Sequence, residues 1–429
     1  MPDLPEAESE PAPPDNFAKI PPPPPTNPRR LDSASFPDGP APGSSSLPLT
    51  IDNVEHLLDR SGISVRFNVL KKRPELRWRD GRPATVNDII SLANINRLNG
   101  SNWLLQFFHD VAMRHPTNPV ADWIGSVPWD GQDRLPAFYA TVETADGYPS
   151  YLKPLLLHRW LLSATAAALL QGRRFHARGV LTLQGPQGIG KTTWIANLVP
   201  AGPLRNELVK RDHHLDGSNK DSILGAIAHW IVEIGELDST FRKDVARLKG
   251  FLTSDCDKVR PPYARSEMEY DRRTVFAATV NDEAFLVDHT GNSRFWTIAV
   301  ERLDYDHTID MQQVFAQLKV EFEAGGQWWL KPSEEESLTR YNLRHRAISA
   351  IRERVLDHID VEAGKDGGGT YMTASQLLRD LGINYPSNAQ AKECGATLRE
   401  TLGAPSRVQG RDQWRITIRD GGSPYARGS

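Results

Sequence analysis

The sequence has few of the features that mark secreted, membrane-spanning or strongly charged proteins. Its 429 residues include only two cysteines, Cys256 and Cys394. This excludes a disulfide framework and a cysteine-based zinc site and indicates a reducing, cytoplasmic compartment. The N-terminus lacks the apolar core of a secretory signal, and no uninterrupted apolar run reaches the ~20 residues of a membrane-spanning helix. The formal net charge is −3, so a nucleic-acid site must be a local patch.

Proline is concentrated near the N-terminus, and the end of this proline-rich segment marks the first expected domain boundary. Residues 1–50 hold 15 of the 32 prolines, and such a composition cannot bury a core. We therefore expect a disordered proline-rich tail there. The periodicities that follow predict a small α+β domain over 51–150, an α/β core over 151–330, a helical connector over 331–366 and a winged-helix-like domain over 367–429.

A glycine-rich loop between an apolar run and an amphipathic run is the strongest motif. It matches G-x-x-x-x-G-K-[ST], the P-loop pattern, in the strand–loop–helix context that the pattern requires. We expect Lys191 to reach the β- and γ-phosphates of ATP and Thr192 to hold Mg²⁺. The other residues expected around the phosphates are Gly185, Pro186, Gln187, Gly188, Ile189, Gly190 and Thr193.

Two later apolar runs end in polar side chains that suit a hydrolysis site. The run HWIVEIGEL (229–237) carries Glu233 and Glu236, both candidate Mg²⁺ ligands. On one strand they would face opposite ways, but Gly235 can break the strand and re-aim Glu236, which we favour for catalysis over Glu233. The buried run TVFAATVN ends in Asn281. That side chain either bridges the γ-phosphate and the attacking water or simply turns the chain. We expect its strand beside the P-loop strand.

Several arginines lie where a neighbouring subunit's nucleotide could be reached. Arg294, in the loop DHTGNSRFW (288–296), is either an ordinary structural donor or a finger that contacts the γ-phosphate in the next subunit. Arg272 and Arg273 enter the Asn281 strand and are alternative fingers.

Basic residues with an interleaved aromatic precede the Asn281 strand. Lys258, Arg260 and Arg265 could grip a phosphate backbone, and Tyr263 could stack on a base. The alternative is a solvated loop with ordinary arginines. In the C-terminal domain, two helices and a hairpin predict a winged helix in which Arg399, Arg407, Arg411 and Arg415 approach DNA phosphates. Winged helices also mediate protein contacts.

The segments that carry these residues resemble the virulence-associated protein E family of phage and mobile-element ATPases. The resemblance implies an AAA+-type core like that of superfamily 3 helicases, a homo-hexameric ring, ATP with Mg²⁺, and DNA translocation during element replication. It also implies Glu236 as the motif B acid, Asn281 as sensor, Arg294 as finger and a pore hairpin. Many relatives carry an upstream primase domain and none is evident here, so a separate primase is a candidate partner. The segments are VAMRHPTNPVADWIGSVPWDGQDRL (111–135), GPQGIGKTT (185–193), HWIVEIGEL (229–237), LKGFLTSDCDKVRPPYARS (248–266) and ATVNDEAFLVDHTGNSRFW (278–296).

Three functions are compatible with these patterns. The first is an ATP-hydrolysing, ring-forming DNA motor, a replicative helicase of a phage or integrated element. The second is a nucleotide-dependent switch or assembly protein in phage defence or interference, without unwinding activity. The third is an origin-binding initiator that uses the winged helix. Stimulation of hydrolysis by single-stranded DNA distinguishes the first from the second, and a sequence-specific footprint marks the third.

Overall fold

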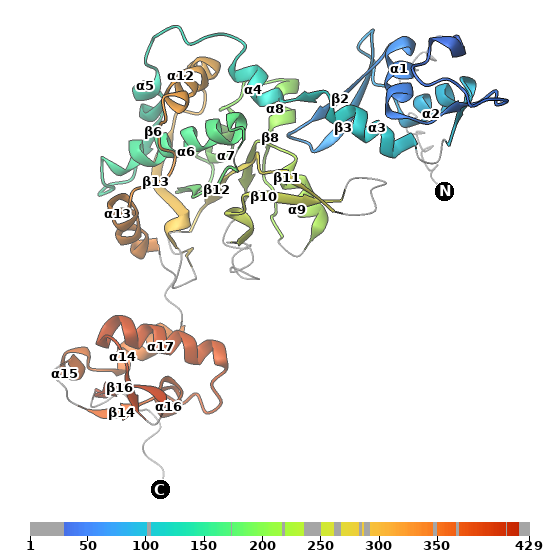
Figure 1. Ribbon diagram of the computed structural model, residues 1–429. Coiled ribbons are helices and arrows are strands. Elements are labelled where there is room, and N and C mark those ends of the chain that lie inside the picture. The colour runs from blue at the N-terminus through green and yellow to red at the C-terminus, as the bar shows by residue number, and fades with distance from the viewer. Residues whose placement is uncertain are drawn as a thin grey trace, which may run out of the picture. The chain divides into compact units, whose positions relative to one another are not determined.

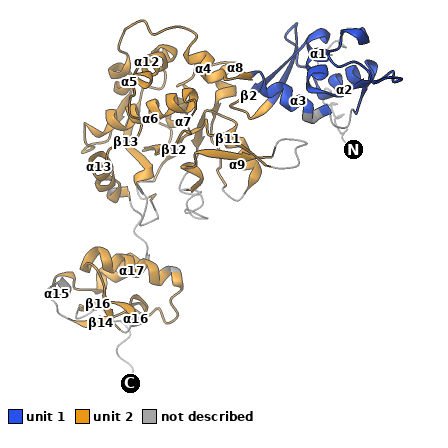
Figure 2. Ribbon diagram, in the orientation of Figure 1, with its two compact units in different colours: residues 1–67, 74–115 blue, residues 68–73, 116–429 orange. Residues whose placement is uncertain are grey.

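The fold was analysed in a computed structural model of the chain. The structure describes residues 30–100, 104–172, 174–216, 219–235, 250–260, 267–282, 285–286, 292–345, 350–365, 369–408 and 410–419. The contacts divide it into two compact units (Figure 2): residues 1–67 with 74–115, and residues 68–73 with 116–429. Among the described helices, none combines the length and the apolar character needed to cross a membrane.

The first unit is a small α+β domain. Thr50 caps its first helix by accepting a hydrogen bond from the amide of Asn53. Thr85 and Asp88 form a reciprocal capping box on the second. The elements are η1 (Ser33–Ser35), β1 (Leu47–Pro48), α1 (Ile51–Ser61), β2 (Ile63–Asn68), β3 (Arg73–Trp78), α2 (Val86–Ile95), β4 (Leu98–Asn99) and α3 (Leu104–Met113).

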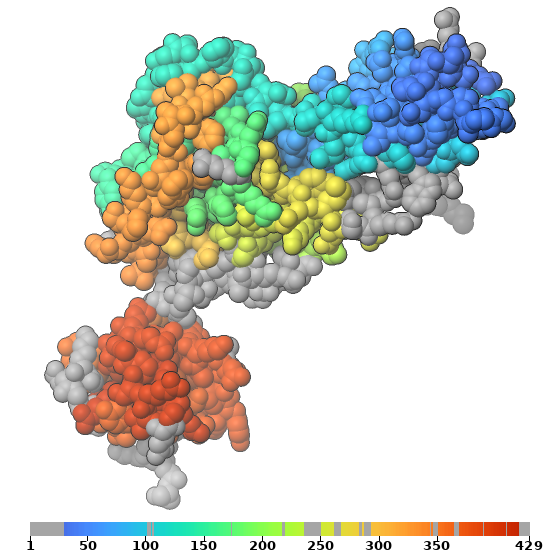
Figure 3. Space-filling model, in the orientation of Figure 1, coloured from blue at the N-terminus to red at the C-terminus, as the bar shows by residue number. Residues whose placement is uncertain are grey.

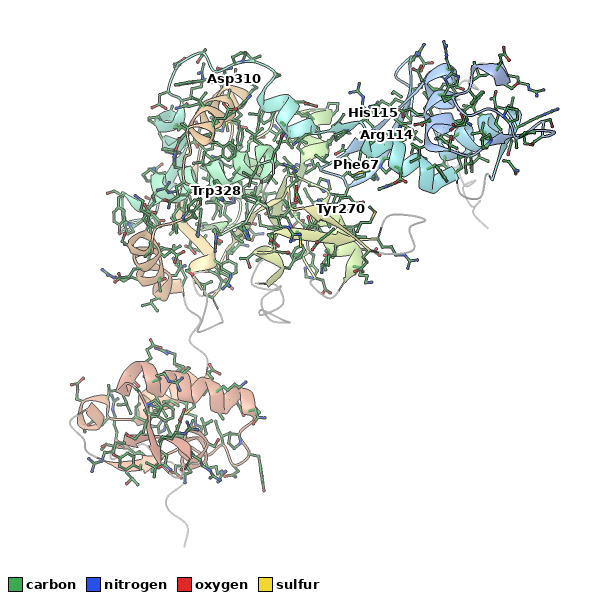
Figure 4. All side chains as sticks on the ribbon, in the orientation of Figure 1. Phe67, Arg114, His115, Tyr270, Asp310 and Trp328 are labelled. Carbon is green, nitrogen blue, oxygen red and sulfur yellow. The ribbon has the colours of Figure 1, made fainter. Side chains whose placement is uncertain are left out.

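This unit begins earlier than the proline-rich composition suggested. Residues 1–29 lie outside the described part, but Phe36 and Leu47 are buried and β1 pairs in parallel with β4. Residues 30–50 therefore contain packed structure where we expected only a disordered tail, because two apolar side chains anchor an otherwise polar segment. At the other end of the unit, Arg114 and His115 (Figure 4) both bond Glu55 of α1, and these bonds lower the pKa of Glu55.

The second unit is built on a six-stranded, largely parallel sheet (Figure 1) in the order β6-β13-β7-β12-β9-β8. All neighbours are parallel except β6, which pairs antiparallel with β13. The Asn281 strand, β12, therefore lies beside the P-loop strand, β7, as we expected. The strands are β6 (Val142–Thr144), β7 (Val180–Gln184), β8 (Val209–Lys210), β9 (Ile231–Ile234), β12 (Val275–Val280) and β13 (Phe295–Leu303).

Alternate residues of these strands enter two different cores, because successive side chains point to opposite faces of a sheet. In β7, Leu181 and Leu183 join one cluster and Val180 joins the other. With both faces covered, the central strands are predominantly apolar, as expected for a parallel sheet. The remaining elements up to residue 345 are β5 (Pro116–Thr117), α4 (Pro119–Ile124), α5 (Leu135–Ala140), α6 (Leu152–Leu169), α7 (Lys191–Ala196), α8 (Pro203–Leu208), α9 (Lys220–Ile227), β10 (Cys256–Val259), β11 (Met268–Asp271), η3 (Asn292–Arg294), α12 (Met311–Glu323), α13 (Pro332–Asn342) and η4 (Leu343–His345).

Residues 116–150, which we placed in the N-terminal domain, pack into this second core. Val120, Ile124 and Phe138 are buried in the same cluster as α6. This segment contains α4, which Asn118 caps. Gln312 of α12 donates to the carbonyl of Ile124, and the two segments lie side by side in the space-filling view (Figure 3).

Residues 350–419 form a C-terminal subdomain with a core of its own. Val355 of α14 and Ile359, directly after this helix, belong to that core, although both precede the expected start of the winged helix. The two expected helices and the hairpin with Gly410 at its turn are present, and a further strand completes a sheet in the order β14-β16-β15. The elements are α14 (Ala350–His358), α15 (Val361–Lys365), β14 (Thr370–Met372), α16 (Ala374–Asp380), α17 (Asn388–Leu402), β15 (Ser406–Val408) and β16 (Arg411–Ile416).

A buried ionic triad joins residues 68–73 to the β10–β11 hairpin within the second unit. Asp257 accepts a hydrogen bond from Arg272 at 2.6 Å and pairs with Lys72 at 3.2 Å. All three are almost fully buried, and the Arg272 guanidinium lies 4.6 Å from the centre of the Phe251 ring. Burial lowers the pKa of Lys72 against the opposing effect of Asp257. The triad thus holds two cations on one carboxylate.

Because the triad contains two cations and one anion, we expect substitutions of its members to have different effects on stability. Asp257→Asn leaves two buried cations without a counter-charge, and we expect a loss of about 3–5 kcal/mol in unfolding free energy. Lys72→Met leaves a matched Arg272–Asp257 pair and should cost clearly less. Urea unfolding followed by tryptophan fluorescence measures both. An equal or larger loss in Lys72→Met would contradict the prediction.

Candidate functional site

The loop between β7 and α7 has a backbone path that only glycine permits at several positions. Gly188 and Gly190 have φ of 85° and 88°, in the left-handed region that disfavours other residues. A Cβ on Gly190 would lie 2.1 Å from the Tyr305 ring, and one on Gly185 would lie 2.2 Å from the carbonyl oxygen of Val300. The spacing of these glycines is therefore imposed by the neighbouring β13 segment as well as by the turn.

Lys191 lies at the centre of this loop. It is 7% exposed, and its Nζ donates to the carbonyls of Gly185 and Pro186, each at 2.7 Å, and to Oδ1 of Asn281 at 3.0 Å. Burial lowers the pKa of Lys191. The structure thus brings together the lysine and the asparagine that we singled out from separate motifs.

The acid that meets the loop is Glu233. It is fully buried at the third position of β9. Its Oε1 accepts hydrogen bonds from the hydroxyls of Thr192 at 3.1 Å and Thr279 at 2.7 Å, and its Oε2 accepts from the amide of Asp212 at 2.5 Å. These three donors come from α7, β12 and the segment after β8, so they fix the carboxylate from three sides.

Glu236, which we favoured, lies outside the described residues, so its position relative to the loop stays a prediction. We expected Gly235 to break the strand and redirect Glu236. The structure adds a second reason for glycine at this position. A Cβ there would lie 2.1 Å from Oδ1 of Asp212. Sequence reasoning missed Asp212 and Thr279. Thr279 could have been found, because it lies two residues before Asn281 and therefore on the same face of the strand.

Arg294 lies at the amino end of β13, whereas the P-loop of the same chain follows the carboxyl end of the neighbouring strand β7. It directly precedes β13, whose first residue, Phe295, pairs with Val180 at the start of β7. The loop begins at Gly185, five residues beyond Val180, or about 16 Å at ~3.3 Å per residue. An arginine side chain cannot cover that distance, so Arg294 cannot reach the P-loop that its own strand flanks.

The two alternative finger candidates are engaged elsewhere, which corrects that expectation. Arg272 is 1% exposed and belongs to the buried triad. Arg273 donates to the carbonyls of Ala167, Ala168 and Leu170, so it satisfies the C-terminal end of α6, where carbonyls lack helical partners. Neither guanidinium is available to a second subunit.

The described part of the insert that carries the candidate DNA contacts contains a hairpin, as the family resemblance implies. Strands β10 and β11 pair antiparallel, with Lys258 opposite Glu269. Lys258 and Arg260 have exposed side chains. Tyr270, labelled in Figure 4, lies on the second strand. The other two candidates, Tyr263 and Arg265, lie between the strands in residues 261–266, outside the described part of the chain.

Comparison with known proteins decides the family. The model of the virulence-associated protein E-like domain matches residues 124–347, more than half of the chain. The chain belongs to the virulence-associated protein E-like family. This confirms the resemblance inferred from the motifs, and the match includes every described residue of the P-loop, Glu233, Asn281 and Arg294. The match begins in α4, inside the segment that packs with the core.

Other comparisons add little to this assignment. No curated protein matches the chain. Among solved structures, the apo structure of the NrS-1 C terminal region is 14% identical, covers 85% of this chain and 98% of that chain, and has a TM-score of 0.35. An A form apo structure of the same region is 15% identical, covers 82% of this chain and 86% of that chain, and also has a TM-score of 0.35.

The residues present in this virulence-associated protein E-like chain fit a magnesium–nucleotide complex. Among the described residues, no group of three or more His, Cys, Asp or Glu side chains could hold a metal ion by itself. Mg²⁺ needs no such group, because it keeps several waters and binds one or two carboxylates together with phosphate oxygens. Thr192 and Glu233, already in contact, would supply protein oxygens for such an ion, and the Lys191 ammonium would supply a cation for the phosphates.

Proposed function

We propose that the protein is an ATP-hydrolysing, ring-forming motor that acts on DNA, with the role of a replicative helicase of a phage or mobile element. One observation carries the proposal. The carboxyl ends of three neighbouring parallel strands bring Lys191, Glu233 and Asn281 to a single glycine-rich loop. Ligands of open α/β sheets bind at such carboxyl ends, and these three side-chain types are those that phosphoryl transfer requires.

Each side chain then has a separate task. The Lys191 ammonium, now shared by two loop carbonyls and Asn281, offers its protons to the β- and γ-phosphate oxygens of ATP. Thr192 and Glu233 hold Mg²⁺, which neutralises charge on those oxygens. The Asn281 amide orients the attacking water. Glu236 remains our candidate for polarising that water, since Glu233 is already committed to three hydrogen-bond donors.

This division of labour predicts different defects for the two acids. Glu233→Gln should weaken Mg²⁺-dependent ATP binding as well as hydrolysis, because it removes the charge beside Thr192. Glu236→Gln should keep binding and lower the hydrolysis rate by about 100-fold or more. Calorimetric titration of ATP with and without Mg²⁺, together with steady-state rates, separates them. Normal hydrolysis in Glu236→Gln would remove that residue from the mechanism.

The ring follows from the position of Arg294. Since it cannot reach the loop that its own strand flanks, a role at a γ-phosphate requires the loop of another subunit. Head-to-tail contacts of this kind generate a ring when the rotation between subunits closes, and the family resemblance favours a closed ring of six subunits. In such a ring each hydrolysis site consists of the P-loop side of one protomer and the Arg294 side of the next.

Mixing two inactive variants tests the shared site. Arg294→Ala and Lys191→Ala should each lose hydrolysis, while their equimolar mixture should regain roughly a quarter of the wild-type rate, because intact halves then meet at random interfaces. Arg302→Ala, an exposed arginine on the same strand, is the matched control and should retain activity. Full activity of Arg294→Ala alone would exclude the finger.

The motor proposal itself depends on DNA. The β10–β11 hairpin offers exposed cations that suit a phosphate backbone. We expect Mg²⁺-dependent ATP hydrolysis that single-stranded DNA stimulates, and a loss of about 100-fold or more in Lys191→Ala. Lys319→Ala, on the surface of α12, serves as the control. A protein that hydrolyses ATP at the same rate with and without DNA, and fails to unwind a forked duplex, would be a switch and not a motor.

A further inference from the structure

The C-terminal subdomain carries a groove of about 830 Å³ between α16, α17 and the β15–β16 hairpin. Positions 388, 391, 392, 395 and 399 of α17 line it, and this spacing places them on one face of the helix. Several of these lining residues are small, among them Ala391, Gly395 and Gly410. The groove is therefore broad and open to an extended ligand.

The groove carries a strong excess of positive charge. Arg379, Lys392, Arg399 and Arg411 line the groove, and Asp412 is the one carboxylate among the described lining residues. The four cations have exposed side chains. Arg399 pairs with Asp412 at 3.6 Å, and both members are more than half exposed. Three positive charges are thus left over around one concave surface, in a chain whose net charge is −3.

We propose that this groove is a second nucleic-acid site, separate from the hairpin of the core, and that it binds the phosphate backbone of duplex DNA. Proteins that grip single strands place open aromatic rings under the bases. The aromatic that lines this groove, Trp414, is only 5% exposed. Its indole nitrogen donates to the carbonyl of Gly403, and the Arg399 guanidinium covers its ring at 5.8 Å.

The rest of the groove has a length and a distribution of cations that suit binding of duplex DNA. Helix α17 has 15 residues and is therefore about 22 Å long, enough to lie along a groove of DNA with its cationic face inward. Arg411, beside the turn of the hairpin, reaches the same concavity from the other side. Cations on both walls can contact phosphates of both strands.

The structure also divides the arginines that the sequence suggested for DNA contact. Arg399 and Arg411 line the groove, whereas Arg407 and Arg415 do not. Along β16, Trp414 and Ile416 enter the core, so Arg415 points to the other face, where its guanidinium lies 5.5 Å from the Tyr371 ring. Arg415 has the same charge on the same strand and is a matched control.

Duplex affinity of the full-length protein tests the proposal. Binding of a labelled 20-base-pair duplex (about two helical turns at ~10 base pairs per turn) is followed by fluorescence anisotropy without nucleotide, across a range of salt concentrations. Arg379→Gln, Lys392→Gln and Arg411→Gln should each weaken binding by about tenfold near 0.1 M salt and reduce the log–log salt slope by about 1. Arg415→Gln should match the wild type.

A variant that should bind duplex DNA more tightly provides a second test. Asp412→Asn removes the carboxylate of the groove and releases Arg399, so duplex affinity should rise severalfold, a result that misfolding cannot imitate. Unchanged affinity in the three groove variants, or a fall in Asp412→Asn, would overturn the proposal. So would a loss of single-strand binding in the three groove variants as large as their loss of duplex binding. Because no nucleotide is present, failure here leaves the hydrolysis tests of the motor unaffected.

Discussion

The parallel pairing of β7 with β12 on one side and β13 on the other is the constraint on which the site depends. Parallel strands end at the same edge of a sheet, so the pairing of β12 with β7 and β9 delivers Asn281 to Lys191 and Thr279 to Glu233. The same register fixes the wall of the loop. The carbonyl of Val300 on β13 passes so close to Gly185 that no side chain fits there. A slip of one residue would reverse every one of these faces.

The sequence predicted those parts of the site that are encoded locally. The P-loop is a contiguous motif, and the buried run before Asn281 is apolar because its strand is covered on both faces. The contacts of Glu233 could not be predicted from local sequence. It depends on the Thr279 hydroxyl and the Asp212 amide, which come from two other strands and meet only in the folded sheet. The preference for Glu236 followed from the ability of Gly235 to break the strand, without knowledge of these donors.

Domain limits were harder to predict than motifs, for a related reason. Residues 116–150 look like an irregular connection because they are rich in proline and tryptophan. However, Asn118 and Pro119 form a helix start that local rules describe well, and β6 joins the far edge of the core sheet by antiparallel pairing. Which core a segment joins is decided by distant partners. The arginines show this too: Arg272 and Arg273 precede a strand, as Arg294 does, yet the first two are buried by contacts with α6 and β10.

Strand β13 touches both halves of the proposed shared site. Near its carboxyl end, Val300 and, just beyond the strand, Tyr305 press on the glycines of the loop, and its amino end begins directly after Arg294. The strand has nine residues, and it pairs with β7 along its first half and with the edge strand β6 along its second half. In the proposed ring, this single strand would therefore join the nucleotide loop of one hydrolysis site to the arginine of the next.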